Sequence, residues 1–200
     1  METMMQMFLF HGRLDVKIEE VAGRFLETKE FYFEAEQMKH NTETNAYAFV
    51  EKDKIRIKKD ILKKKKIPNS AELRKLLEGK DIKIGNVMLR AKESTFVQKG
   101  KKIAIVLDTL INENAVKIAK DASLLICESS FSKDEEEKAK EYFHLTAEQA
   151  ADIAKKSGAE QLFLVHLSQR YDKSENKILA EARKIFPKTR LAHDFMKREI

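Results

Sequence analysis

The sequence is poor in cysteine and in long apolar runs, and both absences exclude classes of protein. A single cysteine, Cys127, excludes an internal disulfide and a zinc site built from several cysteines. Its place at the end of an apolar segment predicts a buried strand residue. No apolar run approaches the roughly 20 residues that cross a bilayer. Residues 1–10 are apolar but lack the basic start and cleavage site of a signal peptide, so we expect a cytoplasmic protein.

Negative charge is nearly absent from one short stretch of the chain. Between Lys52 and Lys66 there are nine basic and two acidic residues, so this run carries +7 while the whole chain carries +6. Such a run can bind the phosphate backbone of a nucleic acid by releasing counterions. It can also be a solvated surface, as in other chains rich in lysine and glutamate. Because the run lies between candidate site residues in the sequence, binding to nucleic acid is favoured over a merely solvated surface.

Two hydrophobic patterns divide the chain, which is short enough to form one domain over residues 1–200. Up to residue 58, apolar and polar residues alternate as in half-buried antiparallel strands. From residue 101, strands alternate with helices, which predicts a layered α/β unit. The early strands are expected at 14–20, 31–36, 46–50 and 54–58, followed by short helices at 60–66 and 71–78 and by short strands or loop over 81–99. The later strands are expected at 103–107, 124–127, 161–166 and 190–196, with helices at 113–121, 134–142, 146–157 and 175–185.

Metal-type side chains follow two of the later strands. The strand 103–107 leads into Asp108, and the strand 161–166 ends at His166. Because α/β proteins usually keep their chemistry at the carboxyl ends of parallel strands, we expect these two side chains to lie close together. A carboxylate and an imidazole are ligands for zinc or a harder metal ion. The sequence therefore predicts a metal site at this edge.

A third candidate lies just before the helix expected over 146–157. This helix begins with a capping box, in which Thr146 is the N-cap and Gln149 follows three residues later, and it ends at Gly158. His144 precedes the helix N-terminus, where the helix dipole favours an anion such as a substrate phosphate. A lone histidine is more often structural, but its position beside two ligand-type residues makes His144 a candidate site residue.

Six segments spread along the chain resemble the motifs of one family in their order. They are Met38-Lys39-His40 with Ala46-Tyr47-Ala48-Phe49, Val106-Leu107-Asp108-Thr109, Ile126-Cys127-Glu128-Ser129-Ser130-Phe131, His144-Leu145-Thr146-Ala147, His166-Leu167-Ser168-Gln169-Arg170-Tyr171 and Leu191-Ala192-His193-Asp194-Phe195-Met196. In these segments the chain resembles ribonuclease Z, the tRNA 3′-end processing endonuclease family of the metallo-β-lactamase superfamily. The resemblance is specifically to the C-terminal portion of that family.

The resemblance implies a fold and a cofactor. The fold would be half of a metallo-β-lactamase αβ/βα sandwich with a protruding basic arm over residues 52–80. The metal ligands would be His40, Asp108 and His166, with Asp108 bridging two zinc ions. His144 would assist proton transfer to the leaving oxygen.

The resemblance also implies how the substrate, a precursor tRNA, would be held. Glu128 would orient His144. The residues that would contact the substrate are Thr146, Ser168 and Arg170 near the cut, with Lys63, Lys64, Lys65 and Lys66 of the arm gripping the tRNA body.

One departure from the family is decisive for activity. The motif His-x-His-x-Asp-His is absent, since no two histidines of this chain lie closer than His144 and His166, 22 residues apart. We therefore expect a split subunit or a fragment that does not cleave tRNA alone and needs a complementing N-terminal half-chain or a homo-oligomer. Residues 4–8 would form a helix that packs on the missing half or, equally, an ordinary core helix. Smaller departures are Val106-Leu107 before the aspartate and Asn69-Ser70 in the arm.

Two other functions stay open on the sequence. The chain could be a non-catalytic tRNA-binding or scaffold subunit, which predicts salt-dependent affinity without a metal requirement. It could also be a phosphodiesterase of the same superfamily with another substrate, because a fold does not fix its chemistry. Replacing Lys63–Lys66 by glutamine separates the two enzymatic alternatives, since only the tRNA enzyme depends on the arm.

Overall fold

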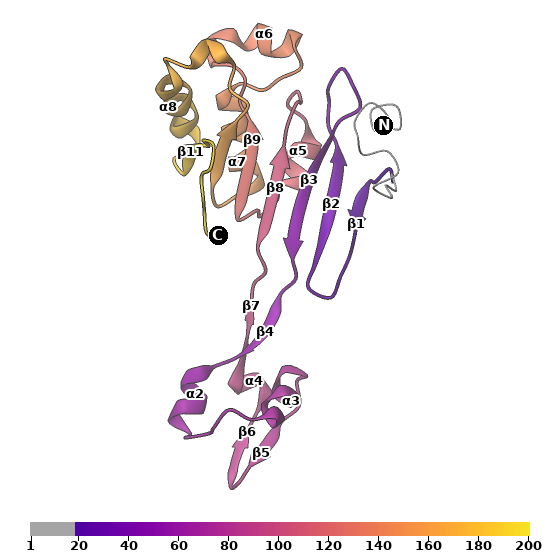
Figure 1. The fold of residues 1–200 in the computed structure, drawn as a ribbon, viewed down its shortest axis with the longest axis vertical. Helices are drawn as coiled ribbons and strands as arrows, with labels where there is room; N and C mark the ends of the chain where they lie inside the picture. The colour runs from indigo at the N-terminus through magenta and orange to yellow at the C-terminus, as the bar shows by residue number, and fades with distance from the viewer. Residues whose placement is uncertain (1–18) are drawn as a thin grey trace, which may run out of the picture.

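The computed structural model describes residues 19–200 (Figure 1). The helix expected over residues 4–8 lies outside the described residues. So does most of the strand expected at 14–20, and its last two residues are not in a strand. Within 19–200, no helix combines the length and the apolar character that a membrane span requires.

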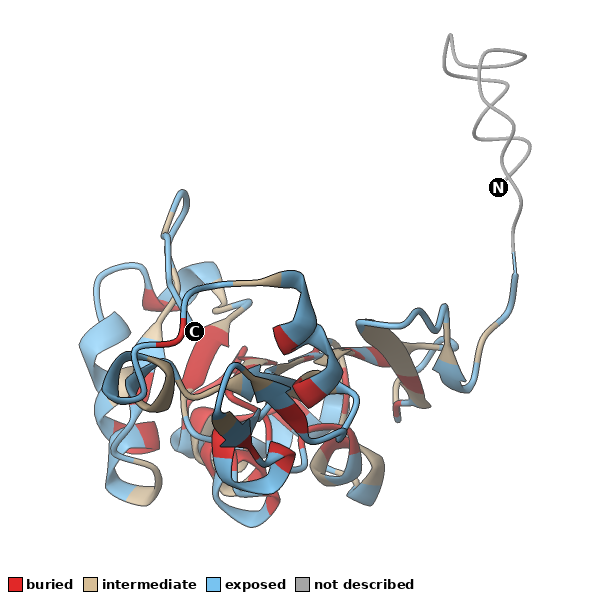
Figure 2. Ribbon diagram, turned by 90° about the horizontal axis from the view of Figure 1, so that it is seen from below, coloured by how far each residue is buried: buried red, intermediate tan, exposed pale blue. Residues whose placement is uncertain are grey.

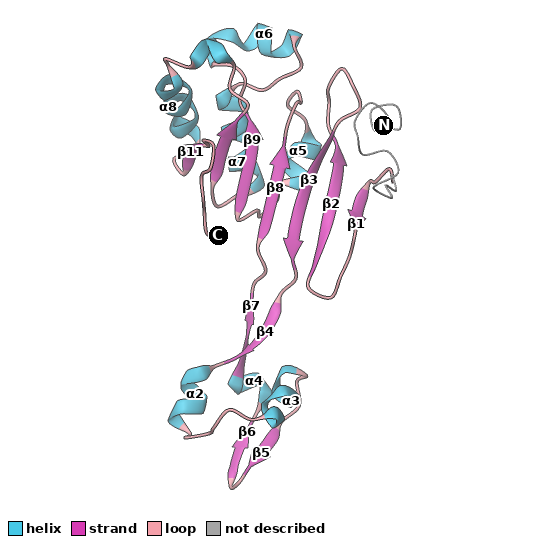
Figure 3. Ribbon diagram, in the orientation of Figure 1, coloured by secondary structure: helices cyan, strands magenta, loops and turns pink. Residues whose placement is uncertain are grey.

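A seven-stranded mixed sheet forms the centre of the molecule (Figure 3). Its strands are β1 (Gly23–Phe25), β2 (Phe31–Gln37), β3 (Asn45–Glu51), β8 (Lys102–Val106), β9 (Leu124–Glu128), β10 (Leu162–Val165) and β11 (Thr189–Leu191), side by side in that order. Pairing is antiparallel from β1 to β8 and parallel from β8 to β11. The parallel part brings the carboxyl ends of its strands to one edge.

Helices cover one face of this sheet, and most of the core lies between them and the strands (Figure 2). They are α5 (Glu113–Ile118), α7 (Ala147–Ser157) and α8 (Glu175–Ile185). The shorter α6 (Glu136–Glu141), preceded by the turn η2 (Lys133–Glu135), lies near the carboxyl ends of the strands. Small side chains let α7 approach the sheet closely, since its alanines at 147, 150, 151 and 154 are all fully buried. The core therefore depends on the close approach of helix and sheet more than on large side chains.

The other face of the sheet carries aromatic side chains that none of these helices covers. Phe33 of β2 lies directly opposite Phe49 of β3, with ring centroids 5.5 Å apart. Phe25 and Phe31 extend the same cluster at 5.3 to 5.9 Å. Tyr47 remains 42% exposed. A contiguous apolar surface of this kind is a feature of interaction sites. We call these five residues the aromatic face.

Residues 54–98 project from the sheet as an arm (Figure 1). Its neck is the antiparallel pair β4 (Lys54–Ile57) and β7 (Thr95–Gln98). Its tip contains α2 (Lys59–Lys64), η1 (Ala71–Leu73), α3 (Arg74–Leu77), the hairpin of β5 (Ile82–Ile84) and β6 (Val87–Leu89), and α4 (Ala91–Ser94). A separate core that includes Leu73, Leu76 and Leu89 holds the tip together. The projection extends beyond residue 80 because the chain returns to the sheet only through β7.

Gly100 allows the two strands that enter and leave the arm to approach each other. A Cβ atom at this position would lie 1.8 Å from the carbonyl oxygen of Glu51. We expect Gly100→Ala to lower the free energy of unfolding by about 1–3 kcal/mol, because a backbone atom must move. Thermal unfolding monitored by circular dichroism measures this loss. Gly85→Asn is the control, since that turn position has open space and asparagine tolerates its positive φ.

The predicted fold class, a layered α/β unit, is confirmed, and several local predictions agree closely. The helix expected over 175–185 has those bounds, and the capping box of Thr146 and Gln149 is formed. Gly158 ends α7 with φ 72°. The strand expected over 190–196 is shorter and ends at Leu191. The chain leaves the sheet there, and Phe195 is 98% exposed with a left-handed backbone.

Candidate metal centre

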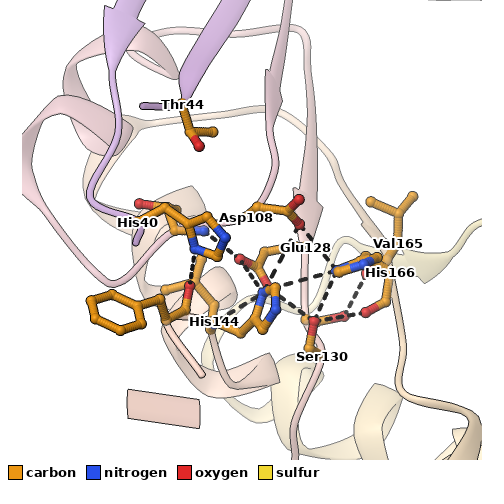
Figure 4. A network of polar contacts seen from close by, with 12 residues as sticks. His40, Thr44, Asp108, Glu128, Ser130, His144, Val165 and His166 are labelled. Carbon is orange, nitrogen blue, oxygen red and sulfur yellow. Dashed lines mark hydrogen bonds and ion pairs between the residues drawn. The ribbon is translucent and has the colours of Figure 1, made fainter. Parts of the chain in front are cut away.

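Three neighbouring parallel strands deliver polar side chains to one edge of the sheet. Asp108 follows β8 by two residues, Glu128 is the last residue of β9, and His166 follows β10 directly. His144 reaches the same place from the segment between α6 and α7 (Figure 4). The structure therefore brings together side chains that are far apart in the sequence.

Glu128 is the centre of the polar network at this edge and is fully buried. Its carboxylate accepts hydrogen bonds from the backbone N–H groups of Thr109 at 2.6 Å and Leu145 at 3.2 Å. The hydroxyl of Ser130 donates to the same carboxylate at 2.9 Å. Nδ1 of His144 lies 3.0 Å from one carboxylate oxygen and 3.2 Å from the other. Because a carboxylate accepts, Nδ1 carries the hydrogen, and Nε2 of His144 makes no hydrogen bond within residues 19–200.

Asp108, His144 and His166 form a compact group of possible metal ligands. One ligand atom from each lies within 4.8 Å of the others. Oδ1 of Asp108 lies 3.3 Å from Nδ1 of His166 and 3.9 Å from Nδ1 of His144. The side chains of His166 and Asp108 are about half exposed, at 51% and 44%. Two imidazoles and a carboxylate open to solvent are a donor set that zinc accepts, so the residues present fit a metal ion.

The backbone at this site is strained at the residues that carry the chemistry. Asp108 and His166 have φ values of 46° and 57°, and Phe143, next to His144, has 61°. A left-handed conformation costs a residue with a side chain about 1–2 kcal/mol. Such strain persists only where the surrounding structure enforces it, and it clusters at functional sites.

His40 lies beside the group rather than within it. Its Nδ1 is 3.1 Å from the carbonyl oxygen of Phe143, and its ring centroid is 5.5 Å from that of His144. The family resemblance groups His40 with Asp108 and His166 as ligands, whereas the geometry groups His144 with these two. With Nδ1 hydrogen bonded to a carbonyl, the Nε2 atom of His40 is the one left to bind a ligand.

The residues expected to contact substrate differ in how many hydrogen bonds their side chains already make within the protein. The hydroxyl of Thr146 caps α7 by accepting from the backbone of Gln149 at 3.2 Å, and the residue is buried. Arg170 is held in place, because Nη1 donates to Glu135 at 2.8 Å and Nε donates to Ser168 at 3.1 Å. Hydrogen bonds from Lys138 and Tyr171 lower the pKa of Glu135 to about 2, so it faces Arg170 as a carboxylate. Lys63–Lys66 lie in the arm, far along the chain from this edge.

Sequence reasoning gave no role to two residues that organise the site. Ser130 links Glu128 to His166, since its hydroxyl lies 2.9 Å from the carboxylate and 3.0 Å from Nδ1 of His166. Tyr171, in the turn η3 (Gln169–Tyr171) that follows β10, accepts from the backbone of Ser132 at 3.0 Å and so ties this turn to the start of η2. Both lie inside the motif segments, so their place in those segments was the available signal. Cys127 is buried as predicted, and burial raises the pKa of its thiol well above the ordinary value.

Comparison with curated proteins identifies relatives of one kind. The chain is 34% identical to ribonuclease Z of Nanoarchaeum equitans over 86% of this chain and 55% of that protein. It is 33% identical to ribonuclease Z of Chlamydia muridarum, over 82% of this chain and 54% of that protein. It is 32% identical to ribonuclease Z of Bacillus cereus, over 92% of this chain and 62% of that protein. The chain thus spans between half and two thirds of the length of these relatives. No protein-family model matches it.

Comparison with solved structures supports the fold. Human tRNase Z, short form, aligns with a TM-score of 0.50 and 22% identity, covering 86% of this chain and 44% of that one. A metallo-β-lactamase fold protein of Bacillus subtilis aligns with a TM-score of 0.53 and 16% identity, covering 84% and 48%. A diphosphatase of the PhnP family aligns with a TM-score of 0.51 and 15% identity, covering 96% of this chain and 52% of that one. In each case this chain corresponds to about half of the solved protein.

Proposed function

Because the chain is homologous to ribonuclease Z over most of its own length and has half of the metallo-β-lactamase fold, we propose that it forms one half of a tRNA 3′-end processing endoribonuclease. The carrying observation is the group of Asp108, His144 and His166 around the buried Glu128. The substrate is a precursor tRNA, the reaction is phosphodiester hydrolysis that removes the 3′ trailer, and the protein works in the cytoplasm.

The metal ions in this proposal are zinc. Asp108 and His166 would hold them, with His40 as a further ligand, and two ions would be present in a complete site. Bound zinc lowers the pKa of a coordinated water and neutralises charge that develops on the phosphate. The open positions of the half-exposed Asp108 and His166 leave room for the substrate.

His144 has the position of a proton donor in this proposal. Its free Nε2 is the atom available to substrate, because Nδ1 is hydrogen bonded to Glu128 at 3.0 Å. The carboxylate fixes the orientation of the ring and the position of its Nδ1 hydrogen. Protonated Nε2 would then give its proton to the leaving 3′ oxygen. Arg170, oriented by Glu135 and Ser168, would contact a neighbouring phosphate.

The ligand set of this chain is too small for two zinc ions, and the aromatic face supports the idea that another polypeptide segment completes it. Three or four ligands serve one tetrahedral ion. Phe33, Phe49 and Tyr47 offer a large apolar surface on the side of the sheet that α5, α7 and α8 leave open. We propose that the part of the ribonuclease Z fold that this chain does not span packs there and supplies the remaining ligands.

Complementation tests this proposal. The purified chain is assayed for 3′-trailer cleavage alone and with a polypeptide carrying the missing part of the fold, taken from the Nanoarchaeum equitans relative. We expect no cleavage by the metal-loaded chain alone and cleavage by the mixture. The variant Phe33→Ser/Phe49→Ser should complement poorly, whereas the exposed Phe195→Ser should complement normally. Cleavage by the chain alone would contradict the proposal unless light scattering showed that a second copy completes the site.

The basic arm is expected to supply RNA affinity that depends steeply on salt. In the quadruple variant Lys63→Gln/Lys64→Gln/Lys65→Gln/Lys66→Gln, the slope of log affinity against log salt should fall by about 3, since each phosphate contact contributes about 0.7–0.9. Fluorescence anisotropy with labelled precursor tRNA measures the slope. The matched control replaces four exposed body lysines, Lys120, Lys155, Lys156 and Lys173, by glutamine.

The two functions left open by the sequence correspond to defined outcomes of these assays. Arm-dependent tRNA binding without cleavage in any complemented mixture would favour a scaffold subunit. Cleavage of small phosphodiesters by the mixture, unaffected by the arm variant, would favour a phosphodiesterase with another substrate.

A further inference from the structure

A hollow of about 460 Å³ opens at the amino ends of β10 and β11. Gln161, which precedes β10, and Thr189, which begins β11, form part of its wall. His166 follows the carboxyl end of β10, so the hollow and the candidate metal centre lie at opposite ends of this strand. It shares no residue with that centre or with the arm.

Four cationic side chains from separate parts of the chain line the hollow. Arg183 comes from α8, Lys188 and Arg190 from the region of β11, and Arg198 from the segment that follows the sheet. The acidic residue of the lining is Glu160. Two of the cations are held by neutral groups: Arg183 donates to the carbonyl of Thr189 at 3.0 Å, and Arg198 donates to the side chain of Gln161 at 2.9 Å.

These four charges have no carboxylate partner in the part of the chain that the structure describes. None of them lies within 4.0 Å of an acidic oxygen there, although Arg24, Arg90 and Arg170 each pair with a glutamate. Lys188 and Arg190 also make no side-chain hydrogen bond within residues 19–200. Like charges crowded around a hollow raise its potential, and a bound anion relieves that repulsion.

We propose that this hollow binds phosphate groups. Arginine presents a planar fork of donors that matches the oxygens of a phosphate, and Arg183 and Arg198 are already fixed by their neutral partners. Lys188 and Arg190, whose side-chain donors make no hydrogen bond within residues 19–200, can donate to the ligand. The phosphate can belong to an RNA backbone or be a free inorganic anion. The inference uses no residue of the metal centre, so it stands or falls independently of the proposed function.

The test is a nuclear magnetic resonance titration of the full chain labelled with nitrogen-15. Inorganic phosphate is added in one arm of the experiment and a short single-stranded RNA in the other. We expect saturable shifts of the backbone amides of Gln161, Thr189 and Arg190 in at least one arm. In Lys188→Gln/Arg190→Gln the affinity should fall at least about tenfold, which corresponds to 1.4 kcal/mol. In the control Lys155→Gln/Lys156→Gln it should change less than about twofold.

Each outcome decides the proposal. Saturation by inorganic phosphate alone assigns a site for a free anion, and saturation by RNA assigns a contact with its backbone. The proposal is overturned if neither probe saturates, if the double variant binds as tightly as the wild type, or if shifts spread evenly over all lysine-bearing surfaces. The dispersion of the variant's own spectrum verifies that it is folded.

Discussion

Glu128→Ala is expected to lower the melting temperature of this chain by about 5–20 °C. The change leaves the N–H groups of Thr109 and Leu145 buried without an acceptor, and each of these residues is fully buried. An unsatisfied buried donor costs about 1–3 kcal/mol. Two of them cost about 2–6 kcal/mol, and 1 kcal/mol corresponds to about 2–4 °C in a chain of this size.

Differential scanning calorimetry measures this loss, and two further variants interpret it. Glu141→Ala removes an exposed carboxylate at the end of α6 and should change the melting temperature by no more than about 2 °C. Glu128→Gln keeps the shape of the side chain and one acceptor oxygen. Its melting temperature should therefore fall by more than that of Glu141→Ala and by less than that of Glu128→Ala. If Glu128→Ala has the same melting temperature as the wild type, the buried hydrogen-bond network does not stabilise the edge of the sheet.

Asp108→Asn is expected to remove metal from the complemented protein and to lower tRNA cleavage by about three orders of magnitude. The carboxamide keeps the shape of the side chain but lacks the negative charge that, in the proposed function, would bind a divalent ion. Oδ1 of Asp108 lies 3.3 Å from Nδ1 of His166, the other proposed ligand. Loss of charge stabilisation worth several kcal/mol accounts for the change in rate, at 1.36 kcal/mol for each factor of ten. Zinc content by mass spectrometry gives a readout that is separate from activity.

The control for this variant is Asp172→Asn, an exposed aspartate close to the same edge. It should keep its zinc and most of its activity. Asp108 is also one of the strained residues, with φ 46°, and asparagine tolerates the left-handed region well. The variant should therefore fold normally, and an unchanged zinc content would exclude Asp108 as a ligand.

The sequence predicted those parts of the fold that depend on neighbouring residues. The capping box of Thr146 and Gln149 and the left-handed Gly158 are local devices, so both ends of α7 could be predicted. Asp108 and His166 could be expected to meet because each follows an apolar strand, and parallel strands share one edge. The same reasoning could not set the end of β11, since an edge strand stops where its neighbour ceases to pair with it.

The sequence could not predict those contacts between distant segments that neither a shared sheet edge nor a motif brings together. Glu135 and Arg170 pair across 35 residues, and His40 binds the carbonyl of Phe143 across 103 residues. No periodicity records such pairs. The sequence did place His144 beside Asp108 and His166, but it gave no sign of the left-handed backbones at Asp108, His166 and Phe143, which the tertiary structure imposes.

The construction of the arm has a consequence for how this protein can change over evolutionary time. Ile57 and Thr95 face each other across the neck, and the tip beyond them has its own core. A two-residue turn can join strands at such a pair. The segment between these two positions is therefore an insertion. It can be lost, lengthened or replaced by a different segment while the strands of the main sheet keep their register. If the proposed function holds, the RNA contacts of the arm and the metal site at the other end of the strands can then diverge at different rates within one gene.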